Sequence, residues 1–96
     1  MAMNPKRREQ VLIHLSGYRG LWQGKDMPYG VTSKGMAVRM GVSRSDMDGV
    51  LKRMEDSGLV FHEVKHVRGT RNKARCYMLR PLGWMIANEL RSEEVA

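Results

Sequence analysis

Cysteine is almost absent from this 96-residue sequence: Cys76 stands alone, so no disulfide can form within the chain. Such cysteine usage fits a reducing compartment. No apolar run approaches the length that crosses a membrane. Nor does an apolar stretch long enough for a signal peptide follow the charges of residues 1–9. We therefore expect a soluble cytoplasmic protein with no membrane partner.

Signatures of catalysis and of cofactor binding are missing too. The sequence holds no Ser/His/Asp set, no phosphate-binding loop and no paired carboxylates. His62, His66 and Cys76 raise the alternative of a metal site, because hairpin pairing can bring His66 near Cys76. A zinc site needs four ligands, and no fourth is evident. We therefore expect no enzyme, no cofactor and no metal.

Acidic residues are outnumbered, since 17 Lys and Arg face 10 Asp and Glu for a net charge of +7. With 42% hydrophobic and 28% charged residues, the length and composition indicate one globular domain. A domain this basic attracts polyanions, although a merely solvated basic surface would have the same composition. The placement of the charges must decide between the two interpretations.

Turn and cap residues divide the chain into a mostly helical α+β pattern. Asn4 is expected to cap the first helix, and Trp22 to pack on the core from the loop 19–30. The expected order is an N-terminal helix within 1–20, a very short strand near Tyr29–Val31, a helix-turn-helix over 32–57, a hairpin over 59–79 with strands at 59–67 and 76–79, and a C-terminal helix over 81–92. This predicts a single domain with a three-helix core, a two- to three-stranded β-wing and a C-terminal helix.

The segment from Thr32 to Met54 has the spacing of a helix-turn-helix. Thr32 and Ser43 are good caps for two short helices. Ala37 is small enough for the helices to touch, and Gly41 tolerates the left-handed backbone that the turn requires. Two unrelated helices would explain the apolar periodicity but not this joint placement. The methionines of the segment are expected to pack in the core, rather than to form an effector pocket.

The predicted hairpin carries a second signal, a run of cations without any acid. Such a hairpin can reach a phosphate backbone while the preceding helix lies in the major groove. A solvated hairpin whose charges protect its edge is the alternative. The cations are Lys65, Arg68, Arg71, Lys73, Arg75 and Arg80.

Three segments resemble the winged-helix regulators of the MarR type and related short archaeal winged-helix proteins: residues 32–45, 51–60 and 77–83. The resemblance implies transcriptional regulation by binding double-stranded DNA, association with the nucleoid, and a homodimer. The sequence departs from the family at Arg80, where a Thr cap is usual, and at Asp48 and Gly49, where Ser and Arg often face DNA. An acid repels phosphate and a glycine reads no base edge, so these changes weaken sequence-specific readout. No effector is predicted.

The candidate DNA contacts follow from this arrangement, with the helix from Arg44 to Ser57 in the major groove. Arg44 is the best candidate for a guanine contact, and the wing residues are expected on the backbone. The full set is Lys34, Arg39, Ser43, Arg44, Ser45, Lys52, Arg53, Arg68, Arg71 and Lys73.

Two further questions stay open at this point. Acidic residues near the recognition helix (Asp46, Asp48, Glu55 and Asp56) favour a different function, a winged-helix protein–protein module in a larger complex. RNA binding is a third, weaker alternative. The outer helices carry apolar residues that either pair across a two-fold axis or pack on each other within one chain. These residues are Val11, Leu12, Leu15, Trp84, Met85, Ile86 and Leu90.

Overall fold

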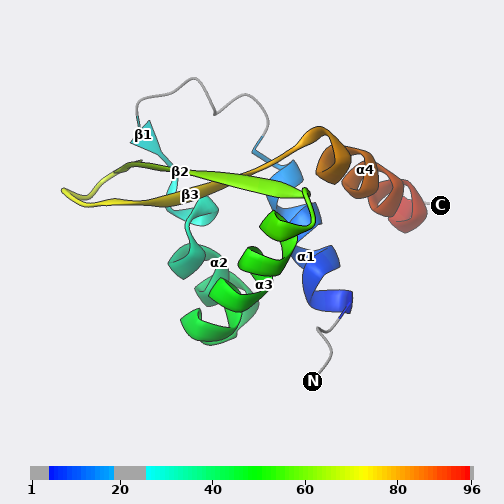
Figure 1. The fold of residues 1–96 in the computed structure, drawn as a ribbon, viewed down its shortest axis with the longest axis horizontal. Coiled ribbons are helices and arrows are strands. Elements are labelled where there is room, and N and C mark those ends of the chain that lie inside the picture. The colour runs from blue at the N-terminus through cyan, green and yellow to red at the C-terminus, as the bar shows by residue number, and fades with distance from the viewer. Residues whose placement is uncertain (1–4, 19–25, 96) are drawn as a thin grey trace.

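The computed structural model describes residues 5–18 and 26–95 (Figure 1). The predicted cap Asn4 and the predicted packing of Trp22 lie outside these residues. A hairpin extends from one side of a helical body, and the last helix lies at the opposite end (Figure 1). The elements are α1 (Pro5–Ser16), β1 (Asp26–Met27), the 3₁₀ helix η2 (Tyr29–Val31), α2 (Ser33–Met40), α3 (Arg44–Asp56), β2 (Val60–Val67), β3 (Lys73–Leu79) and α4 (Pro81–Val95).

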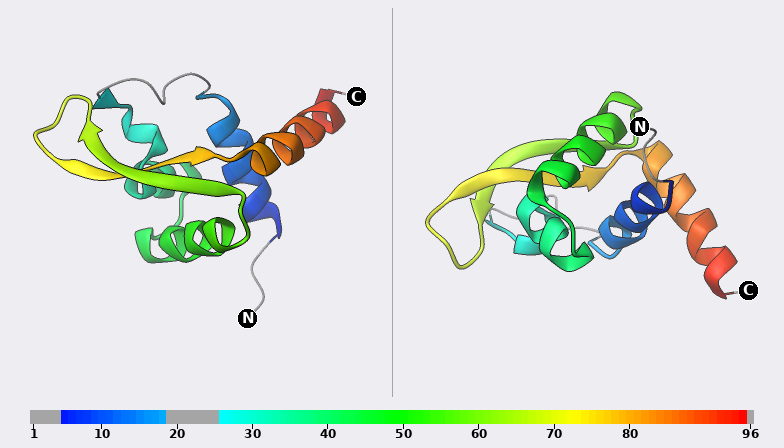
Figure 2. Two further views of the ribbon diagram at one scale, coloured as in Figure 1. Left: turned by 45° about the horizontal axis from the view of Figure 1, so that its top comes forward. Right: turned by 90° about the horizontal axis from the view of Figure 1, so that it is seen from below.

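Helices α2 and α3 form the predicted helix-turn-helix, separated by residues 41–43 (Figure 2). The Thr32 hydroxyl accepts a hydrogen bond from the Gly35 amide at 3.0 Å, and so caps α2. Gly41 ends α2 in the left-handed conformation with φ 68°. The Ser43 hydroxyl accepts from the Asp46 amide at 3.1 Å at the start of α3. Local rules of capping therefore fix both helices and the corner between them.

Three strands form one sheet in the order β1-β2-β3. Strands β2 and β3 are antiparallel from the Val60–Leu79 pair to the His66–Lys73 pair, and β1 runs parallel to β2. The second strand of the hairpin was predicted over 76–79, but it begins at Lys73. The hydrogen-bonded pairing of β2 with β3 extends toward the loop because polar side chains do not prevent backbone pairing. Only residues 68–72 therefore form the wing loop.

The predicted strand at Tyr29–Val31 is wrong, since these residues form η2. The Val31 amide donates to the Pro28 carbonyl at 3.2 Å, and the Thr32 amide donates to the Tyr29 carbonyl at 3.1 Å. These turn hydrogen bonds form directly after Pro28, whose ring fixes φ and removes a donor. The strand of this loop lies earlier, at Asp26–Met27.

The core is built from methionine and aliphatic side chains of every helix. Met36, Met47 and Met54 are fully buried, as core packing predicts, whereas Met40 is half-buried. The predicted contact residue Ala37 is 4% exposed. Within the described ranges, no helix is both long and apolar enough to cross a membrane.

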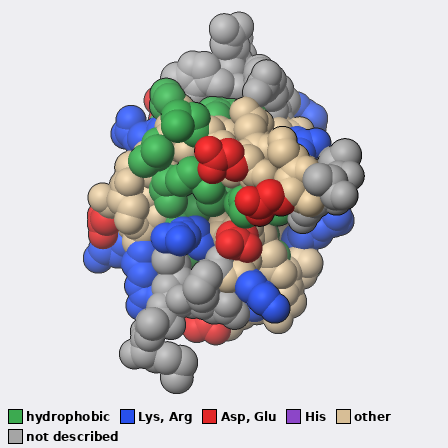
Figure 3. Space-filling model, turned by 90° about the vertical axis from the view of Figure 1, so that its right-hand side faces the viewer, with side chains coloured by type: hydrophobic (Ala, Val, Ile, Leu, Met, Phe, Trp, Pro, Cys, Tyr) green, Lys and Arg blue, Asp and Glu red, His purple; other side chains and the backbone are tan. Residues whose placement is uncertain are grey.

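The two outer helices pack on each other within the chain and differ in what they leave uncovered. The apolar residues of α1 (Val11, Leu12 and Leu15) are all at most 2% exposed. Helix α4 leaves Leu82 and Met85 exposed, at 45% and 61%. Figure 3, which views the molecule from the side of α4, shows hydrophobic side chains gathered into a patch with acidic side chains beside it. Intrachain packing therefore accounts for α1, but not for the exposed face of α4.

Candidate nucleic-acid interface

A groove of about 660 Å³ lies between the start of α2, the start of α3 and the wing. Four cations line it: Lys34 of α2, Arg44 of α3, and Lys73 and Arg75 of β3. The N-termini of α2 and α3 both lie at this groove, and each adds partial positive charge from unpaired amides. Among the described residues that line the groove, Asp48 is the one acid.

The carboxylate of Asp48 accepts a hydrogen bond from within the chain. The Ser33 hydroxyl, on the first residue of α2, donates to a carboxylate oxygen of Asp48 in α3. Ser33 is 6% exposed, so this contact ties the two helices of the helix-turn-helix together next to the groove. The hydrogen bond partly compensates the negative charge of the carboxylate. The four cations of the lining outnumber this one acid.

The cations of β3 follow the two-residue period of a strand. Lys73 and Arg75 point to the same face of the hairpin, and Tyr77 follows them there. Tyr77 is 4% exposed, and burial raises the pKa of its hydroxyl although Arg75 opposes the rise. The strand thus places one buried phenol and two exposed cations along one wall of the groove.

Two cations of the hairpin region have partners inside the chain, Lys65 near the loop end of β2 and Arg80 at the base. The Lys65 ammonium lies 3.9 Å from a Glu63 carboxylate oxygen. The Arg80 guanidinium lies 5.4 Å from the centroid of the Phe61 ring. The cationic run of the sequence therefore divides into Lys65 and Arg80, which contact side chains of β2, and the cations at the groove and the wing loop.

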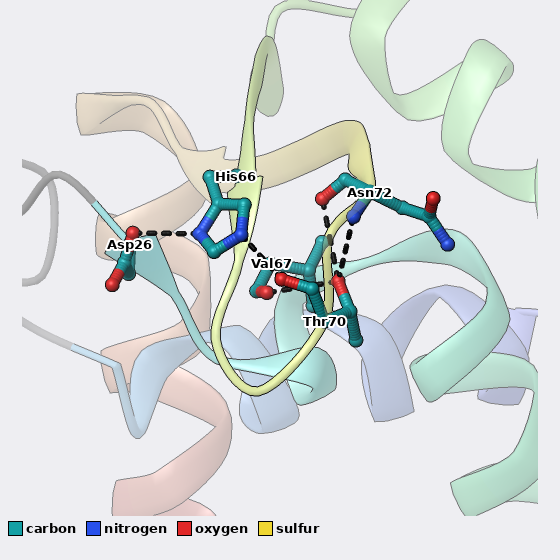
Figure 4. A network of polar contacts seen from close by, with 5 residues as sticks. All are labelled: Asp26, His66, Val67, Thr70 and Asn72. Carbon is teal, nitrogen blue, oxygen red and sulfur yellow. Dashed lines mark hydrogen bonds and ion pairs between the residues drawn. The ribbon is translucent and has the colours of Figure 1, made fainter.

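His66 lies between two acceptors where the wing meets β1 (Figure 4). Its Nδ1 is 2.8 Å from a carboxylate oxygen of Asp26, and its Nε2 faces the Thr70 carbonyl oxygen. An imidazole satisfies both acceptors only when both ring nitrogens carry a proton. The hydrogen bond to Asp26 foremost, and that to Thr70, raise the pKa of His66 above 6.5, while the Lys73 charge lowers it.

The wing loop is closed by further hydrogen bonds of the same region (Figure 4). The Thr70 hydroxyl donates to the Val67 carbonyl at 2.9 Å and accepts from the Asn72 amide at 3.1 Å. The Arg68 amide donates to the Met27 carbonyl of β1 at 2.8 Å. The wing therefore has a defined shape, in which Gly69 adopts φ 82° at the tip.

The alternative that hairpin pairing brings His66 near Cys76 is not met in the structure. His66 pairs with Lys73 and Cys76 pairs with Glu63, and alternation along the strand places the two side chains on opposite faces of the hairpin. Among residues 5–18 and 26–95, no group of three His, Cys, Asp or Glu is placed to hold a metal. Burial raises the pKa of the Cys76 thiol, which disfavours the reactive thiolate.

Three of the ten predicted DNA contacts come together in the groove: Lys34, Arg44 and Lys73. Ser43 uses its hydroxyl as the helix cap. Arg75 was counted among the hairpin cations but not among the predicted contacts. The two-residue period from Lys73 was the signal that could have added it.

The other predicted contacts are exposed outside the groove lining. Arg39 lies in the last turn of α2, away from the start of that helix. The remaining five are Ser45, Lys52 and Arg53 on α3, and Arg68 and Arg71 in the wing loop.

Comparison with known proteins supports the architecture. No protein-family model matches the sequence, and no curated protein matches it. The crystal structure of a MarR family transcription regulator matches 98% of this chain with a TM-score of 0.68 and 20% sequence identity. The match covers 53% of that regulator, so the chain spans about half of its length. The chain therefore has the winged helix-turn-helix fold, as its sequence predicts.

Proposed function

We propose that this chain is a transcriptional regulator that binds double-stranded DNA, with α3 in the major groove and the wing on the sugar-phosphate backbone. One observation carries the proposal. Cations from three separate parts of the chain (Lys34, Arg44, and the pair Lys73 and Arg75) line one groove. Asp48, the one acid among the described lining residues, is hydrogen-bonded to a serine.

The extent of the positive surface favours a polymer over a small anion. One or two cations satisfy a small anion, whereas the cations here continue from the groove onto Lys52 of α3 and onto Arg68 and Arg71 of the wing loop. A duplex presents phosphates at regular intervals over such a distance. The net charge of +7 adds long-range attraction toward chromosomal DNA.

The shape of the surface suits a duplex rather than a single strand. An α-helix fits the width of the DNA major groove, and a hairpin beside it can follow the adjacent backbone. The structurally similar protein is a transcription regulator, which agrees with this use of the fold. Single-stranded binding relies on a series of exposed aromatic platforms. Of the two aromatic residues among the described groove lining, Tyr29 is 44% exposed and Tyr77 is 4% exposed, so a single platform is available.

We further propose that two copies pair through the exposed apolar face of α4, defined by Leu82 and Met85. Both side chains are large and apolar, and each leaves 45% or more of its surface in water. A second copy of the same face would cover them about a two-fold axis. The patch lies away from the groove, so pairing would leave the cations accessible.

Titration with duplex DNA tests the proposal. Random-sequence duplex should shift the protein in a gel at low salt, with weaker binding at moderate salt, because counterions are released. Arg75→Ala should weaken binding, whereas Arg8→Ala, which removes the same charge from the exposed side of α1, should change it less. The absence of any duplex shift would contradict the proposal.

The same titration separates DNA binding from the alternatives. A protein–protein module would not shift DNA, and its main support is weakened because Asp48 bonds Ser33 and Glu55 lies 2.6 Å from the His62 ring. A preference for structured RNA over duplex DNA would instead indicate RNA binding.

A further inference from the structure

Three glycines lie inside the described α-helices, and two of them are explained by packing. A Cβ at Gly35 in α2 would lie 2.0 Å from the Tyr29 carbonyl oxygen. A Cβ at Gly83 in α4 would lie 2.2 Å from the Leu59 carbonyl oxygen. Both positions bring two backbones so close together that no side chain fits. The stability that a helical glycine costs is thus offset by tight packing at these two sites.

Gly49 in α3 has no such explanation. No atom in the described part of the chain, apart from its chain neighbours and its own helix backbone, lies within 4 Å of a Cβ built there. Its φ lies outside the left-handed range, so the backbone conformation does not require glycine either. Alanine would favour the helix over glycine at such a position. The fold alone therefore gives no reason for a residue without a side chain.

Gly49 lies on the outer side of α3, away from the core. The buried side of the helix carries Met47, Val50, Leu51 and Met54. Ser45 is four residues before Gly49 and Lys52 is three residues after it, and these spacings place both beside it on the helix surface. Both neighbours are exposed. The same spacings place exposed Asp46 and Arg53 beside Gly49, so the bare backbone is flanked by a hydroxyl, two cations and one acid on the side proposed to meet DNA.

We propose that Gly49 sets how closely α3 approaches DNA, by allowing the helix backbone itself to contact the floor or wall of the major groove. Glycine is the residue that permits close approach of a backbone to a ligand. Position 49 then offers no side chain to the base edges, so recognition at this position depends on shape and backbone contacts rather than on a base code. This inference rests on the DNA-binding function proposed above.

The variant Gly49→Ala tests the inference with a single methyl group. The variant should be more stable, with Tm higher by roughly 2–8 °C, since the methyl group favours the helix and meets open space. Its affinity for random duplex should nevertheless fall at least about fivefold, because the methyl group holds α3 off the DNA. Gln10→Ala, at an exposed position of α1 outside the groove lining, is the control. It should leave duplex affinity unchanged.

The outcomes separate this inference from the proposed function. If the wild-type chain fails to bind duplex, the proposed function fails. If the wild type binds and Gly49→Ala binds equally well, only the role of Gly49 is overturned. A lower Tm for Gly49→Ala would also overturn it, because the glycine would then have a structural role.

Discussion

The groove beside the wing and the exposed face of α4 lie toward opposite ends of the molecule and have opposite chemistry (Figures 1 and 3). The groove carries Lys34, Arg44, Lys73 and Arg75 and is walled by hydroxyl groups. The face of α4 carries large apolar side chains. Each region suits a different partner, a polyanion at the groove and an apolar surface at α4. The difference teaches that one small fold has room for two separate binding surfaces, which mutation can separate.

The largest effect is expected from the double variant Arg71→Ala with Lys73→Ala. Removing two cations from the wing should weaken binding to all duplexes by roughly tenfold or more, and should reduce the slope of log affinity against log salt by about two. Stability should hardly change, since both side chains are exposed. Fluorescence titration at several salt concentrations measures the effect, and an unchanged slope would remove the wing from the interface.

The next largest effect is expected from Met85→Glu on α4, which tests the apolar face instead of the groove. Met85 is 61% exposed, so the charge should leave the fold of the single chain intact and weaken self-association. Val38→Glu, a similar change at a 69% exposed residue of α2, should leave self-association unchanged. Light scattering across a range of concentrations measures both, and a monomeric wild type at high concentration would reject the dimer.

A smaller effect is expected where the two helices of the helix-turn-helix meet. Ser33→Ala removes the donor to Asp48 and should lower the free energy of unfolding by about 0.5–1.5 kcal/mol. It also leaves the carboxylate charge unscreened beside the groove, so duplex affinity should fall. Asp48→Asn sharpens the test, because loss of the negative charge should raise duplex affinity. Urea denaturation measures the change in stability, and duplex titration measures the change in affinity. Unchanged stability of Ser33→Ala, or unchanged affinity of Asp48→Asn, would contradict the prediction.

The smallest effect concerns pH at the wing. The pKa of His66 is raised in the folded chain, mainly by the hydrogen bond to Asp26. The stabilisation of the fold by protonated His66 is therefore fully present below the unfolded pKa near 6.5. That contribution is lost as pH rises through the higher folded pKa. NMR titration should show His66 titrating above 6.5, and Asp26→Asn should lower its midpoint. A His66 midpoint at or below 6.5 in the wild type would contradict the hydrogen bonds of protonated His66 to Asp26 and Thr70.

Local chemistry allowed much of the helical part to be predicted. The caps Thr32 and Ser43 and the left-handed glycines Gly41 and Gly58 act within a few residues, so the sequence shows them directly. Tyr29–Val31 was mispredicted as a strand because Tyr and Val favour β-structure. The turn that begins after Pro28 outweighs this preference, and the residues form a 3₁₀ helix.

The site could be predicted only in part, because its key contacts join distant residues. Ser33 meets Asp48 across a helix corner, and Asp26 meets His66 across 40 positions of sequence. Neither contact leaves a spacing signal in the sequence. Arg75 could have been added from the two-residue period that starts at Lys73, but the predicted strand began three residues too late and so did not include that period.

Amide NMR of the labelled chain titrated with random duplex DNA tests the central claim most directly. We predict that the largest shifts occur at Ser33, Lys34, Arg44 and Arg75 around the groove, with little change at Met85 on α4. Shifts concentrated on α4, with the groove signals unmoved, would contradict the account.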